Sequence, residues 1–362
     1  MKTPIIFVLS AIVIFFSYFY YFSKTFVRNC NGIDHVINEE FNRSLNQSFI
    51  HNGRNIHAIT GPYRSGKTSN IDILCEDLIF KREIPILVKL SSIVSLEEIF
   101  DDIRLSYVKN MYRLFPFLTL SQQSQLKAIS GNFSSSKFVL SIPKKYFSNE
   151  MPILGKIKGV NAFLSIIHSL VPCHLVVDDA DLLFFIRDKN GAYIDKESII
   201  FLEELIHKRP YQVVLTLSNT LLLQNVSYKN NLIIHDLNYS KIFVEELIKR
   251  HYFTRKETNS IMKIFGIHPG VMSSVYKHLV MNQPLKDSIT FVNANIKESI
   301  AITGNSKLMK QICISKGKLN LKDIYKDTSA LKMIKSGFLW ITREGMVETA
   351  HNGIVNIACS LS

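Results

Sequence analysis

Residues 56–69 read Ile-His-Ala-Ile-Thr-Gly-Pro-Tyr-Arg-Ser-Gly-Lys-Thr-Ser, and they decide the fold of this chain. Within them, the stretch 61–68 matches the pattern G-x-x-x-x-G-K-[ST] in full. A β-branched run, residues 56–60, precedes the match, and a helical pattern, residues 69–80, follows it. A strand, a loop with glycines and a helix in this order form the context in which the pattern binds phosphate.

Each residue type in this loop has a separate task. Glycines let the backbone N–H groups curve around phosphate oxygens, and the helix N-terminus adds partial positive charge. We expect Lys67, as a catalytic residue, to reach the β- and γ-phosphates, and Thr68 to place its hydroxyl on Mg²⁺. Whether Arg64 touches phosphate or only solvent stays open. The predicted nucleotide-binding residues of the loop are Gly61, Pro62, Tyr63, Arg64, Ser65, Gly66, Lys67, Thr68 and Ser69.

Two acidic residues follow a second apolar run, residues 175–177. A nucleotide site of this type needs a carboxylate at a strand end to hold Mg²⁺ through water. We expect Asp178 to be this metal ligand and Asp179 to orient or deprotonate the attacking water. An acidic turn after a buried strand is the structural alternative.

A third apolar run, residues 212–217, ends in Ser218 and Asn219. In P-loop enzymes with an inserted central strand, a polar residue at this point senses the γ-phosphate. We predict Asn219 as this catalytic residue, with Ser218 as the alternative. Either residue is also an ordinary turn former.

Short apolar runs alternate with helical patterns along the middle of the chain, which predicts an α/β fold with a parallel sheet and helices on both faces. The expected strands are residues 56–60, 85–90, 174–179, 212–217 and 232–237. The long stretch 91–173 has helical patterns at residues 96–114, 122–129 and 160–170 and a short strand pattern at 138–142, so we interpret it as a helical insertion.

The N-terminus predicts a membrane anchor. Residues 3–23 carry no charge, and a helix of that length spans a hydrocarbon core of about 30 Å. We expect membrane contact through residues 4–22 and a single-pass membrane protein. Because Lys24 and Arg28 follow directly, the NTPase part would lie on the cytoplasmic or matrix side. A cleaved signal peptide is the alternative, although the segment does not end in small residues.

The net charge indicates the class of partner, and the cysteines indicate the cellular compartment. The net charge is +13, and from residue 241 on 18 Lys and Arg stand against 9 Asp and Glu, which favours anionic partners such as lipid headgroups or nucleic acid. The five cysteines are scattered without CxxC spacing, so the sequence predicts neither a disulfide framework nor a zinc site, and a reducing compartment fits best.

Four segments together resemble the AAA+/STAND superfamily, and within it archaeal-type ATPases with a helical lid and a winged-helix end. They are GPYRSGKT, LVVDDAD, VVLTLSN and GIHPG, and the resemblance covers roughly residues 53–355. It implies the strand order 5-1-4-3-2 and a lid turn that puts His268 and Pro269 close to the base or phosphates of a nucleotide. Many members have Glu where this chain has Asp179, so turnover would be slow or the carboxylate differently placed.

The expected organisation has five parts: a transmembrane anchor at 1–28, a connector at 29–52, a P-loop NTPase core at 53–240 with the insertion 91–173, a helical lid at 241–290, and a winged-helix-like domain at 291–362. In the last part, residues 319–325 and 329–335 are predicted helices. Residues 337–340 and 346–349 would pair as the wing.

The combined expectation is a membrane-anchored P-loop ATPase that binds Mg-ATP and acts as a switch or remodeller on an unknown protein client. The GTPase pattern Asn-Lys-x-Asp is absent, which favours ATP. Two alternatives stay open: a weakly hydrolysing, nucleotide-gated scaffold, and a nucleic-acid-binding ATPase, which the anchor disfavours. No arginine finger is recognisable in the sequence, and a homo-oligomer stays open.

Overall fold

A computed structural model describes residues 39–51, 55–90, 96–130, 153–181, 211–218, 232–237, 239, 241–250, 252–281, 283–324, 327–342 and 344–361. At its centre is a five-stranded sheet in the order β2-β3-β4-β1-β5, in which all the pairings are parallel. The strands are β1 (Ile56–Thr60), β2 (Ile84–Lys89), β3 (Cys173–Asp178), β4 (Gln212–Leu217) and β5 (Leu232–Asp236). Read from the other edge, this is the predicted order 5-1-4-3-2, so the predicted α/β parallel sheet is confirmed.

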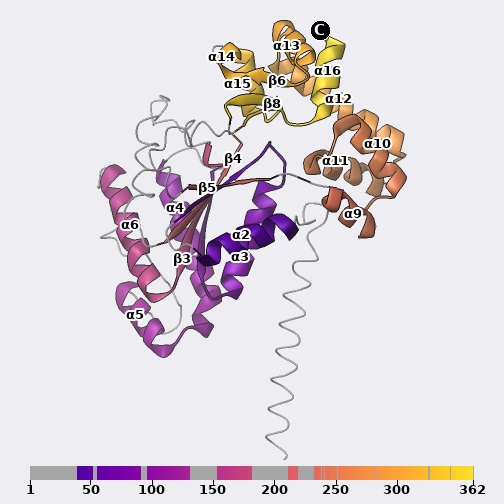
Figure 1. Cartoon of the computed structure of the whole chain (residues 1–362). Helices are drawn as coiled ribbons and strands as arrows, with labels where there is room; N and C mark the ends of the chain where they lie inside the picture. The colour runs from indigo at the N-terminus through magenta and orange to yellow at the C-terminus, as the bar shows by residue number, and fades with distance from the viewer. Residues whose placement is uncertain are drawn as a thin grey trace, which may run out of the picture.

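The three inner strands are buried on both faces, which explains why their sequences are continuous apolar runs rather than alternating ones. Helices α2 (Glu39–His51) and α3 (Lys67–Phe80) cover one face, where their apolar side chains pack on Val176 and Val214. Helices α4 (Leu96–Leu114) and α6 (Ile153–Leu170) cover the other face, with α5 (Leu120–Ser130) and the 3₁₀ turn η3 (Phe115–Phe117) beside them (Figure 1).

After the sheet, the chain is helical and then mixed. Helices α9 (Lys241–Lys249), α10 (Arg255–Phe265) and α11 (Pro269–Val280) share a small apolar core. The long helix α12 (Leu285–Thr303) belongs to two cores, because Val292 packs with the helices before it and Ile300 with the unit after it. The predicted boundary at residue 290 therefore falls within a helix that both units use, and the domain limits stay predictions.

The C-terminal unit has a three-stranded antiparallel sheet in the order β6-β8-β7, formed by β6 (Lys318–Asn320), β7 (Leu339–Ile341) and β8 (Met346–Thr349). Around it lie α13 (Ser306–Ile314), α14 (Leu321–Ile324), α15 (Thr328–Lys335) and α16 (Asn352–Leu361). The sequence-based helix at 319–325 was partly wrong. Residues 318–320 form a strand because Gly317, with φ 84°, ends the preceding helical turn and turns the chain onto β8.

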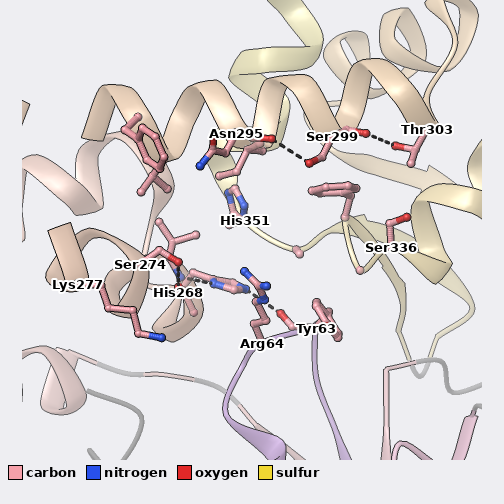
Figure 2. Close-up of a pocket in the computed structure, with 18 of the residues that line it drawn as sticks. Tyr63, Arg64, His268, Ser274, Lys277, Asn295, Ser299, Thr303, Ser336 and His351 are labelled. Atoms are coloured by element: carbon pink, nitrogen blue, oxygen red, sulfur yellow. Dashed lines mark hydrogen bonds between the residues drawn. The ribbon is translucent and has the colours of Figure 1, made fainter. Parts of the chain in front are cut away.

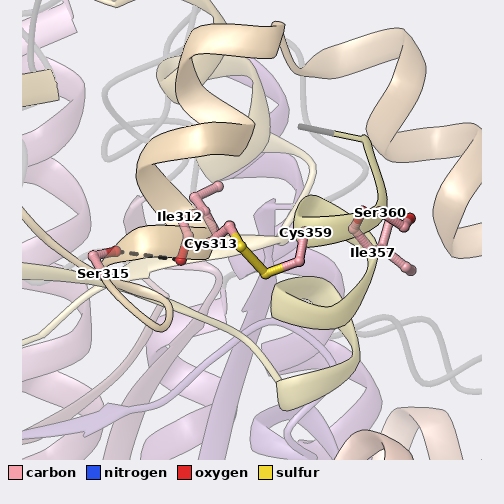
Figure 3. Close-up of a disulfide and its surroundings, with 6 residues drawn as sticks. All are labelled: Ile312, Cys313, Ser315, Ile357, Cys359 and Ser360. Atoms are coloured by element: carbon pink, nitrogen blue, oxygen red, sulfur yellow. Dashed lines mark hydrogen bonds between the residues drawn. A yellow bond between two sulfur atoms is a disulfide. The ribbon is translucent and has the colours of Figure 1, made fainter.

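A disulfide joins Cys313 of α13 to Cys359 of α16, with their Cα atoms 4.9 Å apart (Figure 3). The prediction of no disulfide was wrong for this pair. The two residues are 46 positions apart and belong to no recognisable cysteine motif. Only the packing of α13 beside α16 brings them together. Cys75 and Cys173 are buried free thiols, and Cys30 lies outside the described residues.

The predicted location as a single-pass membrane protein needs correction. Among the helices that the structure describes, none has the length and apolar composition to cross a membrane. The uncharged segment at residues 3–23, on which the prediction rested, lies outside the described residues. Length and hydropathy alone therefore did not suffice to establish an anchor.

The disulfide should stabilise the C-terminal unit. Replacing Cys313 by Ser should lower the free energy of unfolding by about 2–4 kcal/mol, because the crosslink restricts the unfolded chain. Trp340 is the only tryptophan of the chain and lies in β7, so its fluorescence in urea reports unfolding of this unit. Wild-type protein in a reducing agent serves as the control and should match the variant. Identical urea midpoints for the oxidised wild type and the variant would contradict the prediction.

Candidate phosphate-binding site

The loop between β1 and α3 is shaped by its glycines. Gly66 has φ 87°, a left-handed conformation that favours glycine, and it is the residue from which α3 begins. At Gly61, a Cβ would lie 3.0 Å from the Ser65 hydroxyl, so a side chain there would press on the inside of the loop. The Ser65 hydroxyl itself is buried and has no hydrogen-bond partner in the described structure. The loop thus has a tight backbone and an unused buried polar group, which is the chemistry that a phosphate oxygen satisfies.

Lys67 is buried at the start of α3, with its ammonium group over the loop. Its Nζ donates to the carbonyl oxygens of Gly61 and Pro62, at 3.0 and 2.9 Å, and to the Ser218 hydroxyl at 2.8 Å. Burial lowers the pKa of Lys67, and Asp181, Asp179 and Asp178, in that order, raise it again by their charge. The ammonium group therefore lies in an anionic environment but has only neutral hydrogen-bond partners.

Asp178, at the end of β3, is hydrogen-bonded to both helix α3 and strand β4. Its carboxylate accepts hydrogen bonds from Thr68 at 2.8 Å and from Thr216 of β4 at 2.6 Å. Thr68 and Asp178, the two predicted metal ligands, therefore meet directly. A hydroxyl and a carboxylate at a strand end are the hard oxygen donors that Mg²⁺ prefers, so these residues fit the ion.

Asp179 follows in a left-handed conformation, with φ 54°. Its N–H donates to the Thr216 hydroxyl at 2.7 Å, so one threonine positions both acids. Burial, and next the charge of Asp178, raise the pKa of Asp179. A carboxyl whose pKa is raised binds a proton more readily, which suits a group that accepts one from water.

Asp181 is a further acid of this site that the sequence analysis missed. Its side chain is buried, its Oδ1 has no partner among the described residues, and the backbone of Ser218 hydrogen-bonds its carboxylate. Burial raises the pKa of Asp181 to about 6, although Lys67 opposes the shift. The motif LVVDDAD contains this third acid, but the spacing gave no sign that it would face Lys67.

The lid residues lie directly on the loop. His268 Nδ1 accepts from the Val271 N–H at 3.3 Å, so its Nε2 carries the proton and donates to the Tyr63 carbonyl at 3.1 Å. Burial lowers the pKa of His268 to about 4, which keeps the ring neutral. Pro269 is the first residue of α11, and the Gly270 N–H donates to the Arg64 carbonyl at 3.1 Å.

The structure therefore brings together the loop residues, Asp178, Asp179, His268 and Pro269. Ser69 lies in the first turn of α3 and is half-buried. Ser218 reaches Lys67, whereas the predicted sensor Asn219 lies outside the described residues. Among the described residues, no group of three or more His, Cys, Asp or Glu side chains could hold a metal ion by itself.

Comparisons with known proteins place the fold. No family model matches the sequence, and no curated protein matches it either. The Walker-type ATPase PABY2304 of Pyrococcus abyssi aligns with a TM-score of 0.53 and 14% identity, over 89% of this chain and 95% of that chain. The ORC2 protein of Aeropyrum pernix, solved in ADPNP-ADP complexes, aligns with a TM-score of 0.46 and 9% identity, over 88% of this chain and 92% of that chain.

The first of these likenesses shows that the chain has the fold of a Walker-type ATPase over most of its length. The predicted P-loop fold is thus confirmed. The alignment with PABY2304 does not support the STAND part of the resemblance or a membrane anchor.

Asp181 should make the protein less stable as the pH rises. Its pKa is about 6 in the folded chain against 3.8 ordinarily, so the folded state retains a proton that the unfolded chain has lost. Stability is therefore lost between about pH 4 and 6, by up to about 2–3 kcal/mol. The Asp181→Asn variant cannot ionise and should lack this contribution.

Urea unfolding at about pH 4.5 and about pH 7.5 measures this difference. The variant should gain stability relative to wild type at the higher pH. A difference between the two proteins that is the same at both pH values would refute the prediction.

Proposed function

We propose that this protein is a Mg-ATP-dependent P-loop ATPase that works as a conformational switch. One observation carries the proposal. The buried ammonium group of Lys67 lies over a glycine-shaped loop with only neutral hydrogen-bond partners, while Thr68 and Asp178 meet beside it. A polyphosphate would supply the negatively charged partner that the Lys67 ammonium group lacks. The backbone N–H groups of the loop would donate to the phosphate oxygens.

The chemistry assigned to the site is hydrolysis of the γ-phosphate. Water attacks the γ-phosphorus, the bond to the ADP oxygen breaks, and ADP and phosphate leave. Mg²⁺, held by Thr68 and Asp178, would neutralise charge on the β- and γ-phosphates. Asp179 orients the water and accepts its proton, and Thr216 positions Asp179 through the backbone.

The switch follows from the contacts of the lid with the loop. His268 and Gly270 donate to two consecutive carbonyl groups of the loop, those of Tyr63 and Arg64. Any shift of this backbone on nucleotide binding changes both hydrogen bonds together, so the loop and the start of α11 move as a pair. The lid would pass the nucleotide state on to a protein client.

A weakly hydrolysing scaffold is the second candidate, and the position of Asp179 favours it. The residue is an Asp in a left-handed turn, with a shorter side chain than Glu and an N–H fixed to Thr216. Such a carboxylate has little freedom to follow the attacking water, which would slow turnover while leaving binding intact. A nucleic-acid-binding role rests on the basic charge of the C-terminal part and on its winged-helix-like pattern.

Nucleotide binding is tested with the full chain and a fluorescent ATP analogue in the presence of Mg²⁺. Lys67→Ala should weaken binding by about 10- to 100-fold, the loss expected for hydrogen bonds to a charged group. Lys81→Ala is the matched control, because Lys81 caps the other end of the same helix and is exposed. Equal affinities of wild type and Lys67→Ala would contradict the proposal.

Turnover separates the two candidates. Asp179→Asn should leave ATP affinity within about threefold and reduce phosphate release by about 100-fold or more. Wild-type protein that binds ATP but releases no phosphate above the Asp179→Asn variant would favour the scaffold over the ATPase.

A further inference from the structure

A cavity of about 670 Å³ lies where three parts of the chain meet. Its walls come from the tip of the phosphate-binding loop, from helices α11 and α12, and from the turn before β7 together with the segment before α16 (Figure 2). A space of this size accommodates a small organic molecule. None of residues 65–69 lines it, so the cavity adjoins the loop but is separate from the place where Lys67 reaches.

The lining of the cavity is basic and contains no acid. Among the described residues that line it there is no Asp or Glu, whereas Arg64 and Lys277 both contribute. Among the described residues, no ion pair joins Arg64 to a carboxylate, and its guanidinium carbon lies 5.7 Å from the centroid of the Tyr63 ring. Arg64 is exposed, so an anion can reach it from solvent through the open side of the cavity.

The backbone of Arg64 is also held in place. Its backbone has φ 57°, and its carbonyl accepts from the N–H of Gly270. A side chain at Gly270 would overlap the Cβ of Arg64, so the lid lies against this residue. Figure 2 shows Arg64, His268 and His351 turned toward one another at the centre of the site. The backbone from which the Arg64 side chain starts is therefore already ordered before an anion binds.

The remaining walls offer polar and aromatic groups. Asn295, Ser299 and Thr303 stand one turn apart along α12, and they line one side. Phe291 and Phe338 add flat apolar surface. An anionic group on a flat apolar body matches this combination better than either a simple ion or an uncharged molecule.

We propose that this cavity is a second ligand site, which binds a small organic anion with its charged group at Arg64 and its flat body against α12 and Phe338. The ligand would contact the loop tip, the lid and the C-terminal unit at once. The C-terminal unit already packs on the loop tip, since a Cβ at Gly337 would overlap the Tyr63 ring. Occupancy therefore fixes the C-terminal unit on the loop, and ligand and nucleotide change each other's affinity.

The test uses 2-naphthoate as the probe and 2-naphthamide as its uncharged counterpart, with the full chain. Isothermal calorimetry should detect binding of the carboxylate and at least about tenfold weaker binding of the amide. Arg64→Asn should reduce affinity for naphthoate about tenfold or more, since Asn adopts the left-handed conformation without strain. Ser299→Leu, which adds an apolar side chain to the α12 wall of the cavity, should also weaken binding. Lys67→Ala should leave it unchanged.

Three results would overturn the proposal. They are equal affinity for naphthoate and naphthamide, loss of naphthoate binding in Lys67→Ala but not in Arg64→Asn, and full displacement of naphthoate by Mg-ATP in proportion to nucleotide occupancy. The last two would place the anion in the phosphate-binding loop. Failure of the proposed ATPase function is seen separately, in the ATP affinity of Lys67→Ala, and leaves the naphthoate result intact.

Discussion

The site depends on one buried charge without a direct anionic partner. Lys67 lies at the start of α3 with its ammonium group over the loop, and its three hydrogen-bond partners are all neutral oxygens. Burial disfavours its charged form, and only the more distant Asp178, Asp179 and Asp181 restore it. Three carboxyl groups near one ammonium group leave an excess of negative charge, which a divalent cation such as the proposed Mg²⁺ would offset. The order of the strands, which puts β4 between β1 and β3, is what assembles these groups.

The upper part of the molecule extends this arrangement. Helix α11 begins at the loop, with His268 and Gly270 bonded to adjacent carbonyl groups. Helix α16 of the C-terminal unit packs against α10 of the lid. Asn356 of α16 donates to the Ile264 carbonyl at 3.2 Å, and Gly353 approaches the Phe265 ring. The disulfide from Cys359 to α13 ties this last helix to its own unit. The loop, the lid and the C-terminal unit are therefore joined by direct contacts, so a movement of the loop affects all three.

Much of this could be predicted from the sequence, and the failures have physical causes. The parallel sheet followed from buried β-branched runs and from a motif that needs a strand before it and a helix after it, whereas the strand order was implied by the resemblance to archaeal-type ATPases. The place of Asp181 in the site was not predicted, because it depends on the direction of the turn after β3. The strand at residues 318–320 was not predicted, because so short a strand forms only by pairing with β8. The Cys313–Cys359 pair depends on helix packing that no spacing encodes. The membrane location was predicted from the hydropathy of residues 3–23, which lie outside the described residues, and no described helix could cross a membrane.

The central claim is that the loop and Lys67 hold a polyphosphate. Amide hydrogen exchange of the full chain, with and without Mg-ATP, tests it most directly. The account predicts slower exchange in residues 61–68, because phosphate oxygens would accept from those N–H groups, together with a change at residues 268–271 of the lid. Unchanged exchange across 61–68 at saturating Mg-ATP would contradict it.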